Sequence, residues 1–302
     1  MSAITTGSHP KALWPGVKRW WGVEYNRYQP VWPQLFESLT SEQNYEEDVE
    51  DVGFGLMTTK NQGSGIYYDT TQQGNTTRYV HLTYALGYVV TMEELQDNLY
   101  EKVSFKRVSR LARSVAETQE IIHASVFNRA FNASYVGGDG VSLINPAHPT
   151  ANGSQSNALA TPADLSEASI EDLGVQIMQC CDTRGLRMLN RPQALLVPAQ
   201  EIYNAQRIVK SDKQNDTGNN AINVINASGM FPKGIIMNPY FDDPDAWFIK
   251  TDCPEGLTHY NRMEPTFDKD NDFDTKNLKA SVVTRWSQGW TNWRQLYGSQ
   301  GA

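Results

Sequence analysis

Apolar residues recur at helical spacing along residues 91–133, a stretch that contains neither Pro nor Gly. The apolar stripe runs from Leu95 to Ala130, and its period of about 3.6 residues predicts one long amphipathic helix. Thr91 and Glu94 have the spacing of a capping box at the start of this helix. At 1.5 Å per residue the helix would be a rod of roughly 60 Å. Such a rod suits an elongated subunit better than a compact enzyme core.

Strict alternation of apolar and polar residues predicts long strands near the C-terminus. We expect strands over 257–267 and 278–297, separated by a polar loop. One face of the second strand would carry Leu278, Ala280, Val282, Thr284, Trp286 and Trp290. This face is the natural partner for the apolar stripe of the long helix.

Residues 53–90 are rich in Gly, Thr, Tyr, Asn and Gln. Strand propensity over 66–71 and 77–90, around the turn signal QQGN, predicts a long β-hairpin with its tip near Gly74. An isolated two-stranded ribbon with few apolar residues is marginal in water. We therefore expect contacts with other chains to stabilise it. Lys60 would lie at the base of this hairpin.

Residues 1–52 show no sustained periodicity and mix Trp and Tyr with Pro. Only 33–39 has the pattern of a helical turn or two, so the segment is expected to be an arm. It would lie either on its own subunit or on a neighbouring one. The acidic run 44–51 is expected to be a solvated link.

Helical patterns alternate with short apolar runs along residues 161–254, which predicts a compact α/β unit. A loop rich in Gly, Asn, Ser and Pro precedes this unit. The expected helices are 166–182 and 199–210. The expected strands are 194–197, 223–226, 235–238 and 247–250.

Charge, cysteine content and hydropathy exclude several classes of protein. The formal net charge of −8 argues against a dedicated nucleic-acid binder, which would carry a basic face. Three Cys residues form no disulfide framework and suggest reduced thiols. No apolar run is long enough to span a bilayer, and the N-terminus does not read as a signal peptide. These features predict folding in a cytoplasm and no membrane partner.

The candidate metal, nucleophile and phosphate-binding motifs lack the residue spacing or sequence context that such sites need. The acidic run 268–274 imitates a calcium loop, but Phe273 and Lys279 stand where Gly and Glu are needed. Cys180 and Cys181 lie in an apolar helix and are expected to be core thiols. The five His residues show no metal-ligand spacing, and GGDG at 137–140 lacks the context of a phosphate loop. We predict no catalytic, cofactor or metal site.

The order of these elements resembles the major capsid (coat) proteins of tailed bacteriophages, which have the Hong Kong 97-type fold. The most similar stretches are RPQALLVPAQEIYNAQRIVKS (191–211), GIIMNPYFDDPDAWFIKTD (234–252) and FDTKNLKASVVTRWSQGWTNWRQLYGS (273–299). The resemblance implies an α+β chain. It would have an N-terminal arm at 1–52, an extended β-hairpin loop at 53–90, a peripheral domain with the spine helix at 91–160, an α/β axial domain at 161–254, and peripheral return strands at 255–302.

The function that this resemblance implies is structural. The chain would self-assemble as hexamers and pentamers into an icosahedral head shell around double-stranded DNA, with no cofactor. The expected partners are further copies, scaffolding, portal and decoration proteins, and DNA held without specific contacts. The shell would assemble in the bacterial host cytoplasm and belong to the virion. We expect neither proteolytic maturation nor crosslinking through Lys60.

Aromatic residues of the arm and hairpin are the expected contacts between subunits. The candidates are Trp14, Trp20, Trp21, Tyr67, Tyr68, Arg78 and Tyr79. For each, packing within its own subunit is the alternative. Two other functions stay open at this point. One is the shell of an encapsulin-type cellular compartment, and the other is a soluble two-domain enzyme without a recognisable motif.

Overall fold

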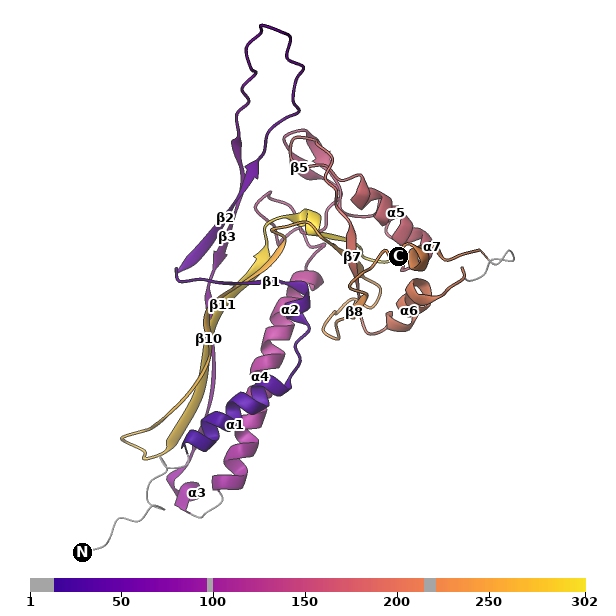
Figure 1. Cartoon of the computed structure of the whole chain (residues 1–302). Coiled ribbons are helices and arrows are strands. Elements are labelled where there is room, and N and C mark those ends of the chain that lie inside the picture. The colour runs from indigo at the N-terminus through magenta and orange to yellow at the C-terminus, as the bar shows by residue number, and fades with distance from the viewer. Residues whose placement is uncertain (1–13, 97–99, 215–220) are drawn as a thin grey trace, which may run out of the picture.

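The computed structural model describes the backbone of residues 14–96, 100–214 and 221–302, and the side chains of 21–94, 106–214 and 221–302. The molecule is elongated (Figure 1). Long strands and a long helix form one part, a smaller α/β unit lies beside it, and a thin loop projects away from both. The predicted mixture of helices and strands is confirmed.

The long strands form a four-stranded sheet, here called the long-strand sheet, in the order β1–β10–β11–β4. β10 (Leu257–Asn271) and β11 (Leu278–Trp290) are antiparallel, β1 (Glu37–Thr40) is parallel to β10, and β4 (Leu82–Val90) completes the sheet. The predicted alternation is confirmed, because Leu278 to Trp286 are buried at every second position.

The strand predicted over 278–297 is instead two strands. β11 ends at Trp290, where the side chain of Asn292 caps the 3-10 helix η3 (Trp293–Gln295) by accepting the N–H of Arg294. The following β12 (Leu296–Ser299) joins the other large sheet. The strand predicted from the sequence continues past Trp290, but the observed strand ends there at a local cap.

The spine helix is shorter than predicted. α3 (Met92–Gln96) and α4 (Tyr100–Asn128) occupy the predicted range, and 97–99 lie outside the described residues. Arg107 Nη2 lies 2.7 Å from Glu94 Oε1, although 13 residues of straight helix would separate them by roughly 20 Å. α3 therefore does not extend α4 along one straight axis. Of the predicted capping box, the bond from the Glu94 N–H to the Thr91 hydroxyl is present.

The far end of α4 also differs from the prediction. Regular helix stops at Asn128, after which the N–H of Ala130 donates to the carbonyl of Phe127, three residues back instead of four, and the carbonyl of Ala130 accepts the N–H of Ile144. The predicted apolar face is nevertheless used. Val108, Leu111 and Val115 are buried in one cluster, whose other members include β10 and β11 residues.

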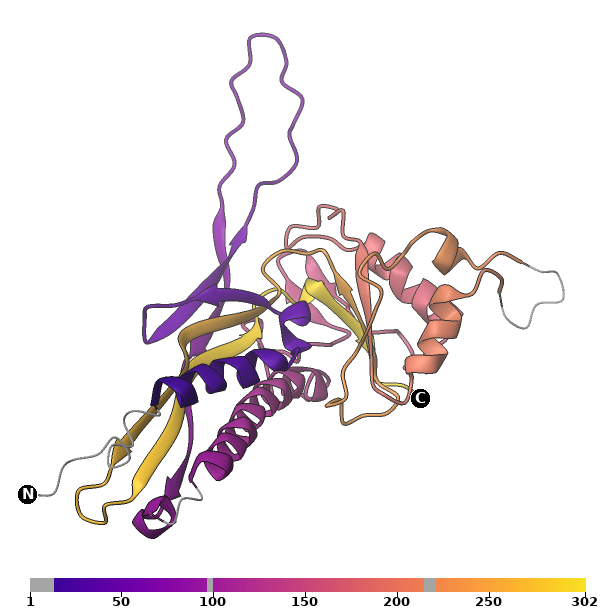
Figure 2. The same cartoon turned by 60° about the horizontal axis from the view of Figure 1, so that its bottom comes forward.

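The arm contains a helix that the sequence pattern did not predict. α1 (Trp14–Arg27) lies alongside α4 (Figures 1 and 2). Pro15 falls in the first turn, where its missing N–H costs no helical hydrogen bond. Trp21 stacks on both Tyr25 and Phe267 with ring centroids 5.7 and 5.3 Å apart. The described part of the arm therefore packs on its own subunit, and a single turn, α2 (Trp32–Leu35), follows.

The extended loop is built from different strands than expected. β3 (Gln72–Val80) pairs with β2 (Tyr45–Val52), while β4 pairs separately with β11. We call β2 and β3 the loop ribbon and residues 53–71 the extended loop. The run 44–51 is thus mainly strand rather than a solvated link. Gly74 lies inside β3 against Glu50, where a Cβ would lie 3.0 Å from the Glu50 carbonyl oxygen, beside a register shift.

The tip of the extended loop lies near Gly63, which has a φ of +84°. The N–H of Ser64 donates to the carbonyl of Asn61 across this turn. Lys60 is therefore next to the tip, and the expectation that it lies at the base was wrong. Its position no longer argues against a crosslink.

The α/β unit contains the second large sheet, here called the short-strand sheet, in the order β12–β9–β7–β8. β7 (Pro192–Val197), β8 (Ile235–Met237) and β9 (Trp247–Thr251) confirm three predicted strands. α5 (Glu167–Met178) and α6 (Ile202–Lys210) confirm the two predicted helices, and Ser166 caps α5 in a capping box.

Two local predictions in this region were wrong. The strand expected at 223–226 is the helical turn α7 (Val224–Ala227), because the Asn223 side chain accepts the N–H groups of Ile225 and Asn226. The predicted loop before the α/β unit also contains a small hairpin of β5 (His148–Thr150) and β6 (Gly153–Gln155).

Candidate functional site at the base of the extended loop

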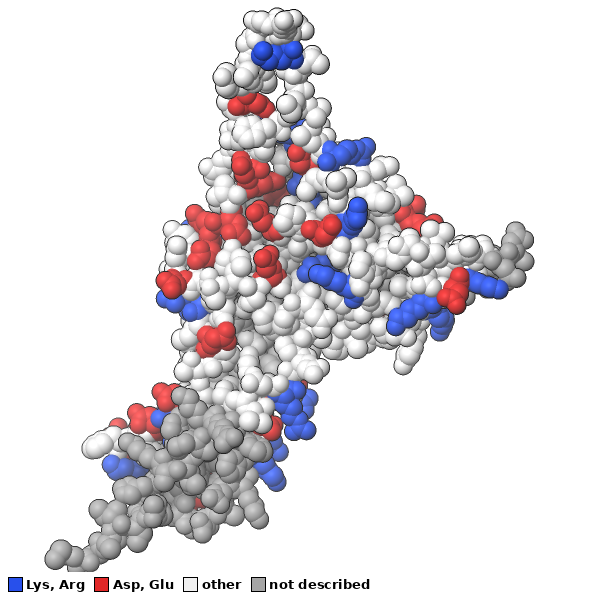
Figure 3. Space-filling view, viewed as in Figure 1, with Lys and Arg blue, Asp and Glu red and all other residues white. Residues whose placement is uncertain are grey.

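The carboxylates of β2 alternate between two environments. Glu46, Asp48 and Glu50 are partly buried, whereas Glu47 and Asp51 are exposed. Figure 3 shows acidic side chains gathered at the base of the projecting loop and little charge further out. Each inward carboxylate accepts a side-chain hydroxyl, from Ser41 at Glu46, from Tyr260 and Thr291 at Asp48, and from Thr183 at Glu50.

Asp48 fastens the loop ribbon to the long-strand sheet. Its two oxygens accept the hydroxyls of Tyr260 at 2.7 Å and Thr291 at 2.8 Å. The Tyr79 hydroxyl lies 2.7 Å from the same Thr291 oxygen. Burial raises the pKa of both Tyr79 and Tyr260, so the phenols stay protonated and remain able to donate.

Glu50 of the ribbon and Asp69 of the extended loop both bind residues of the α/β unit. Glu50 accepts the Thr183 hydroxyl at 2.6 Å, and Arg294 Nη1 lies 3.5 Å away. Asp69 lies 2.5 Å from Arg184 Nη1 and accepts the N–H of Gly55 from the opposite side of the loop. Backbone hydrogen bonds, and then the one from Arg184, lower the pKa of Asp69.

Beyond this base, the extended loop exposes an unusual amount of apolar surface. Tyr67 and Tyr68 are 68% and 83% exposed. Four further large side chains of the loop are exposed, and they are Phe54, Leu56, Met57 and Ile66. A concentration of this kind marks an interaction surface more often than a free surface.

The other predicted contact residues lie elsewhere. Tyr79 and Trp21 are 3% and 6% exposed and pack within the subunit, which leaves little of either for another chain. The Arg78 guanidinium stacks 3.7 Å above the Tyr45 ring centroid, and its Nε lies 3.4 Å from Glu47 Oε1. The side chains of Trp14 and Trp20 lie outside the described residues.

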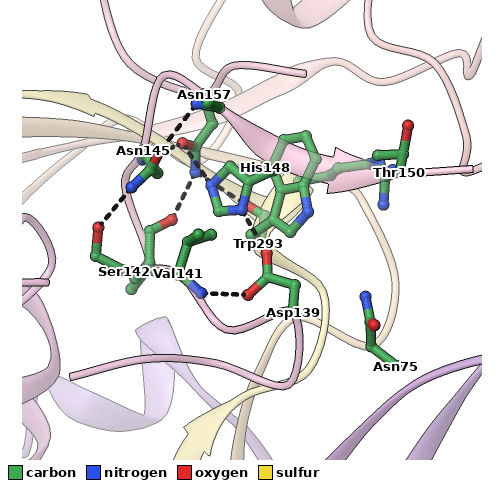
Figure 4. A network of polar contacts seen from close by, with 12 residues as sticks. Asn75, Asp139, Val141, Ser142, Asn145, His148, Thr150, Asn157 and Trp293 are labelled. Atoms are coloured by element: carbon green, nitrogen blue, oxygen red, sulfur yellow. Dashed lines mark hydrogen bonds and ion pairs between the residues drawn. The ribbon is translucent and has the colours of Figure 1, made fainter. Parts of the chain in front are cut away.

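A buried polar network supports the ribbon from the side (Figure 4). His148 Nδ1 lies 2.6 Å from Asp139 Oδ2, and its Nε2 lies 3.0 Å from Asn157 Oδ1. The ring stacks on Trp293 at 4.1 Å between centroids. Asn157 Nδ2 donates in turn to the carbonyl of Leu143. Sequence reasoning missed this network, because its members are isolated polar residues without a motif.

The geometry of this network indicates a structural role rather than a catalytic one. An Asp–His pair can orient a general base, but both nitrogens of His148 already face partners and the side chain is fully buried. The neighbouring 137–140 loop touches β3, where a Cβ on Gly138 would lie 2.6 Å from Thr77 Oγ1. The network therefore holds the loop that supports the ribbon.

Other chemical groups give no site in the described part of the chain. No group of three or more His, Cys, Asp or Glu side chains there could hold a metal ion. Burial raises the pKa of Cys180, and that of Cys253 to about 12, which disfavours the thiolate. No described helix is both long and apolar enough to cross a membrane.

Solved structures with a similar fold include several shells. The chain matches a structure titled "Mycobacterium phage Patience" with a TM-score of 0.56 and 10% identity, covering 99% of this chain and 90% of that one. For the capsid of an empty GTA particle the TM-score is 0.57 with 10% identity, covering 91% of each chain. For a virus-like particle from Pyrococcus furiosus it is 0.54 with 10% identity, covering 94% and 97%. No curated protein matches the sequence.

Most of the sequence matches one protein family. Residues 74–298 match the family described as "Phage capsid protein". The match begins within β3 and ends in β12, so it includes the long strands, the spine helix and the α/β unit. With the fold shared with the solved capsids, it confirms the predicted resemblance to phage capsid proteins. The chain belongs to the phage capsid protein family.

Proposed function

We propose that the protein is the major capsid protein of a tailed phage, and that its copies assemble as hexamers and pentamers into an icosahedral shell around double-stranded DNA. The role is structural and needs no catalysis or cofactor. Scaffolding, portal and decoration proteins are the further partners that we propose, with assembly in the bacterial host cytoplasm. The domain boundaries given above belong to this proposal.

The observation that carries the proposal is the extended loop with its firmly held base. Both sides of the base are tied to the subunit, yet the six large apolar side chains of the loop have no cover within it. A second copy of the chain is the simplest cover, because a repeated contact of this kind closes into a shell. Tyr67, Tyr68 and Arg78 are the described contact residues that we propose.

Expression of the protein alone, followed by size-exclusion chromatography and negative-stain imaging, tests the shell. Closed particles are expected, whereas a stable monomer or dimer would contradict the proposal and favour a soluble enzyme. Replacing 56–68 with a short Gly-Ser linker should abolish particles while the subunit stays folded. This deletion spares β3, whose Tyr79 is part of the subunit's own core.

A cellular compartment shell is the second candidate, because the virus-like particle from Pyrococcus furiosus shares the fold over nearly the whole chain. Particles purified from the native source distinguish the two functions. Packaged double-stranded DNA supports the phage capsid, whereas an enclosed enzyme without a genome supports the compartment.

A further inference from the structure

The short turn α2 lies where the spine helix, the arm and the short-strand sheet meet (Figure 1). Leu35 and the following Phe36 are 1% and 3% exposed. They belong to one core cluster that also contains Phe127 of α4 and Phe248 of β9. The arm thus inserts two apolar side chains into a core shared by both parts of the subunit.

The N-terminal end of α2 is bound by the spine helix. Val31 at the N-cap position offers no side-chain hydrogen bond of its own. Instead, Glu120 Oε1 accepts the N–H groups of Val31 and Trp32. Glu120 is 7% exposed. Burial raises its pKa, and the two backbone hydrogen bonds act in the opposite direction. A carboxylate here complements the positive end of the peptide dipoles.

The C-terminal end of α2 is bound by the short-strand sheet. Lys250 of β9 donates from Nζ to the carbonyl of Leu35 at 2.5 Å and to that of Gln34 at 3.4 Å. Lys250 is 8% exposed, and no carboxylate of the described residues lies within ion-pair distance of it. The carbonyls of α2 are therefore the main partners of this buried ammonium group.

Aromatic stacking fixes the side of α2 as well as its ends. The Trp32 ring lies 4.4 Å from His123 of α4 and 4.5 Å from His259 of β10, between ring centroids. The two imidazoles also bond each other, with 3.0 Å between His123 Nε2 and His259 Nδ1. One turn of the arm is thus held by α4, β9 and β10 together.

We propose that α2, with Glu120 and Lys250, is a clamp that fixes the angle between the spine helix and the short-strand sheet within each subunit. Each part contributes one buried polar group, and α2 provides the hydrogen-bond partners of Glu120 Oε1 and Lys250 Nζ, whereas Glu120 Oε2 is buried without one. If the parts turned relative to each other, at least one of these groups would lose its partners while still buried, which is costly. The proposal concerns the single subunit and does not depend on shell assembly.

Pulsed electron–electron resonance between two spin labels tests the clamp. Cysteines placed at the exposed Arg110 of α4 and Tyr203 of α6 carry the labels, in a background with Cys181→Ser, and labelled protein is diluted into excess unlabelled protein. The parent should give one narrow distance distribution. Glu120→Ala and Lys250→Met should each broaden it or add a second distance.

Matched variants separate the clamp from general loosening. Glu120→Gln retains an oxygen acceptor and should keep the narrow distribution. Glu117→Ala removes a carboxylate three residues earlier in α4 that pairs with Arg113 on the surface, and Lys279→Met removes an exposed lysine. Both controls should match the parent.

Two results would overturn the proposal. One is a parent-like distribution in both Glu120→Ala and Lys250→Met, and the other is equal broadening in the controls. Thermal unfolding of each labelled variant establishes that the measured protein is folded. Because the two groups belong to different parts of the subunit, either variant alone suffices if the other does not fold.

Discussion

Replacing His259 with Gln tests how the buried imidazole pair limits stability in acid. His123 Nδ1 faces the carbonyl of Gln119 at 2.6 Å and must carry a proton, so its Nε2 accepts from His259. Each ring therefore holds one proton and is neutral. Burial lowers the pKa of His123 to about 3 and that of His259 to about 4, from 6.5.

The sign of the pH effect follows from these values. Between about pH 6.5 and the lowered pKa values, the unfolded chain binds protons that the folded chain does not. Stability from the pair is therefore fully present above pH 6.5 and is lost as the pH falls. At 1.36 kcal/mol per pKa unit, each histidine lowers the free energy of unfolding by about 2 kcal/mol at pH 5 relative to pH 8. The pair together lowers it by about 4 kcal/mol.

Urea unfolding of the dissociated subunit at several pH values between 5 and 8 measures this loss. His259→Gln removes one titrating ring. Between pH 8 and 5 the variant should therefore lose about 2 kcal/mol less unfolding free energy than the parent protein. Other titrating groups cancel in the difference between the two proteins. A difference in unfolding free energy that stays constant over this pH range would refute the reasoning.

Three further perturbations have measurable outcomes. Burial lowers the pKa of Lys250 to about 8 from 10.5, so the unfolded chain binds its proton more tightly between these values. Stability should therefore rise by about 2 kcal/mol from pH 8 to 10 relative to Lys250→Met, and parallel pH profiles would contradict this. Arg184→Ala removes the cation bound to Asp69. Proteases should then cleave the extended loop faster, with little change in melting temperature. An unchanged cleavage rate would show that the backbone hydrogen bonds of Asp69 hold the loop without Arg184. Gly138→Ala places a Cβ against β3 and should cost about 1–3 kcal/mol in chemical unfolding, whereas Gly65→Ala, with open space around it, should cost less; equal costs would contradict the close packing.

The elements that sequence reasoning located have one buried face set by local periodicity. β11 buries every second residue, and the middle of α4 buries a stripe at helical spacing, so their patterns are visible without knowing the partner. The predicted start of the helix 166–182 agrees with the structure, where Ser166 caps α5. The capsid resemblance rested on these elements and on nearby stretches of the α/β unit.

The misplaced elements depend on partners far away in the sequence. β2 reads as a solvated acidic run because its stabilising donors, Thr183 and Tyr260, are 133 and 212 residues away from their carboxylates. Once β2 was missed, β3 had no visible partner and the hairpin was assigned to the wrong strands. α1 was missed because its Pro and Gly suggested irregular chain, whereas Trp21 packs on a strand near the other end of the protein.

The base of the extended loop determines how a mechanical load would pass through the subunit. Asp48 ties the ribbon to the long-strand sheet. Glu50 of the ribbon binds Thr183 of the α/β unit, and Asp69 of the extended loop binds Arg184 there. A pull applied at the tip therefore divides between two anchorages instead of bending one. Tension on the extended loop would therefore reach both parts of the subunit directly.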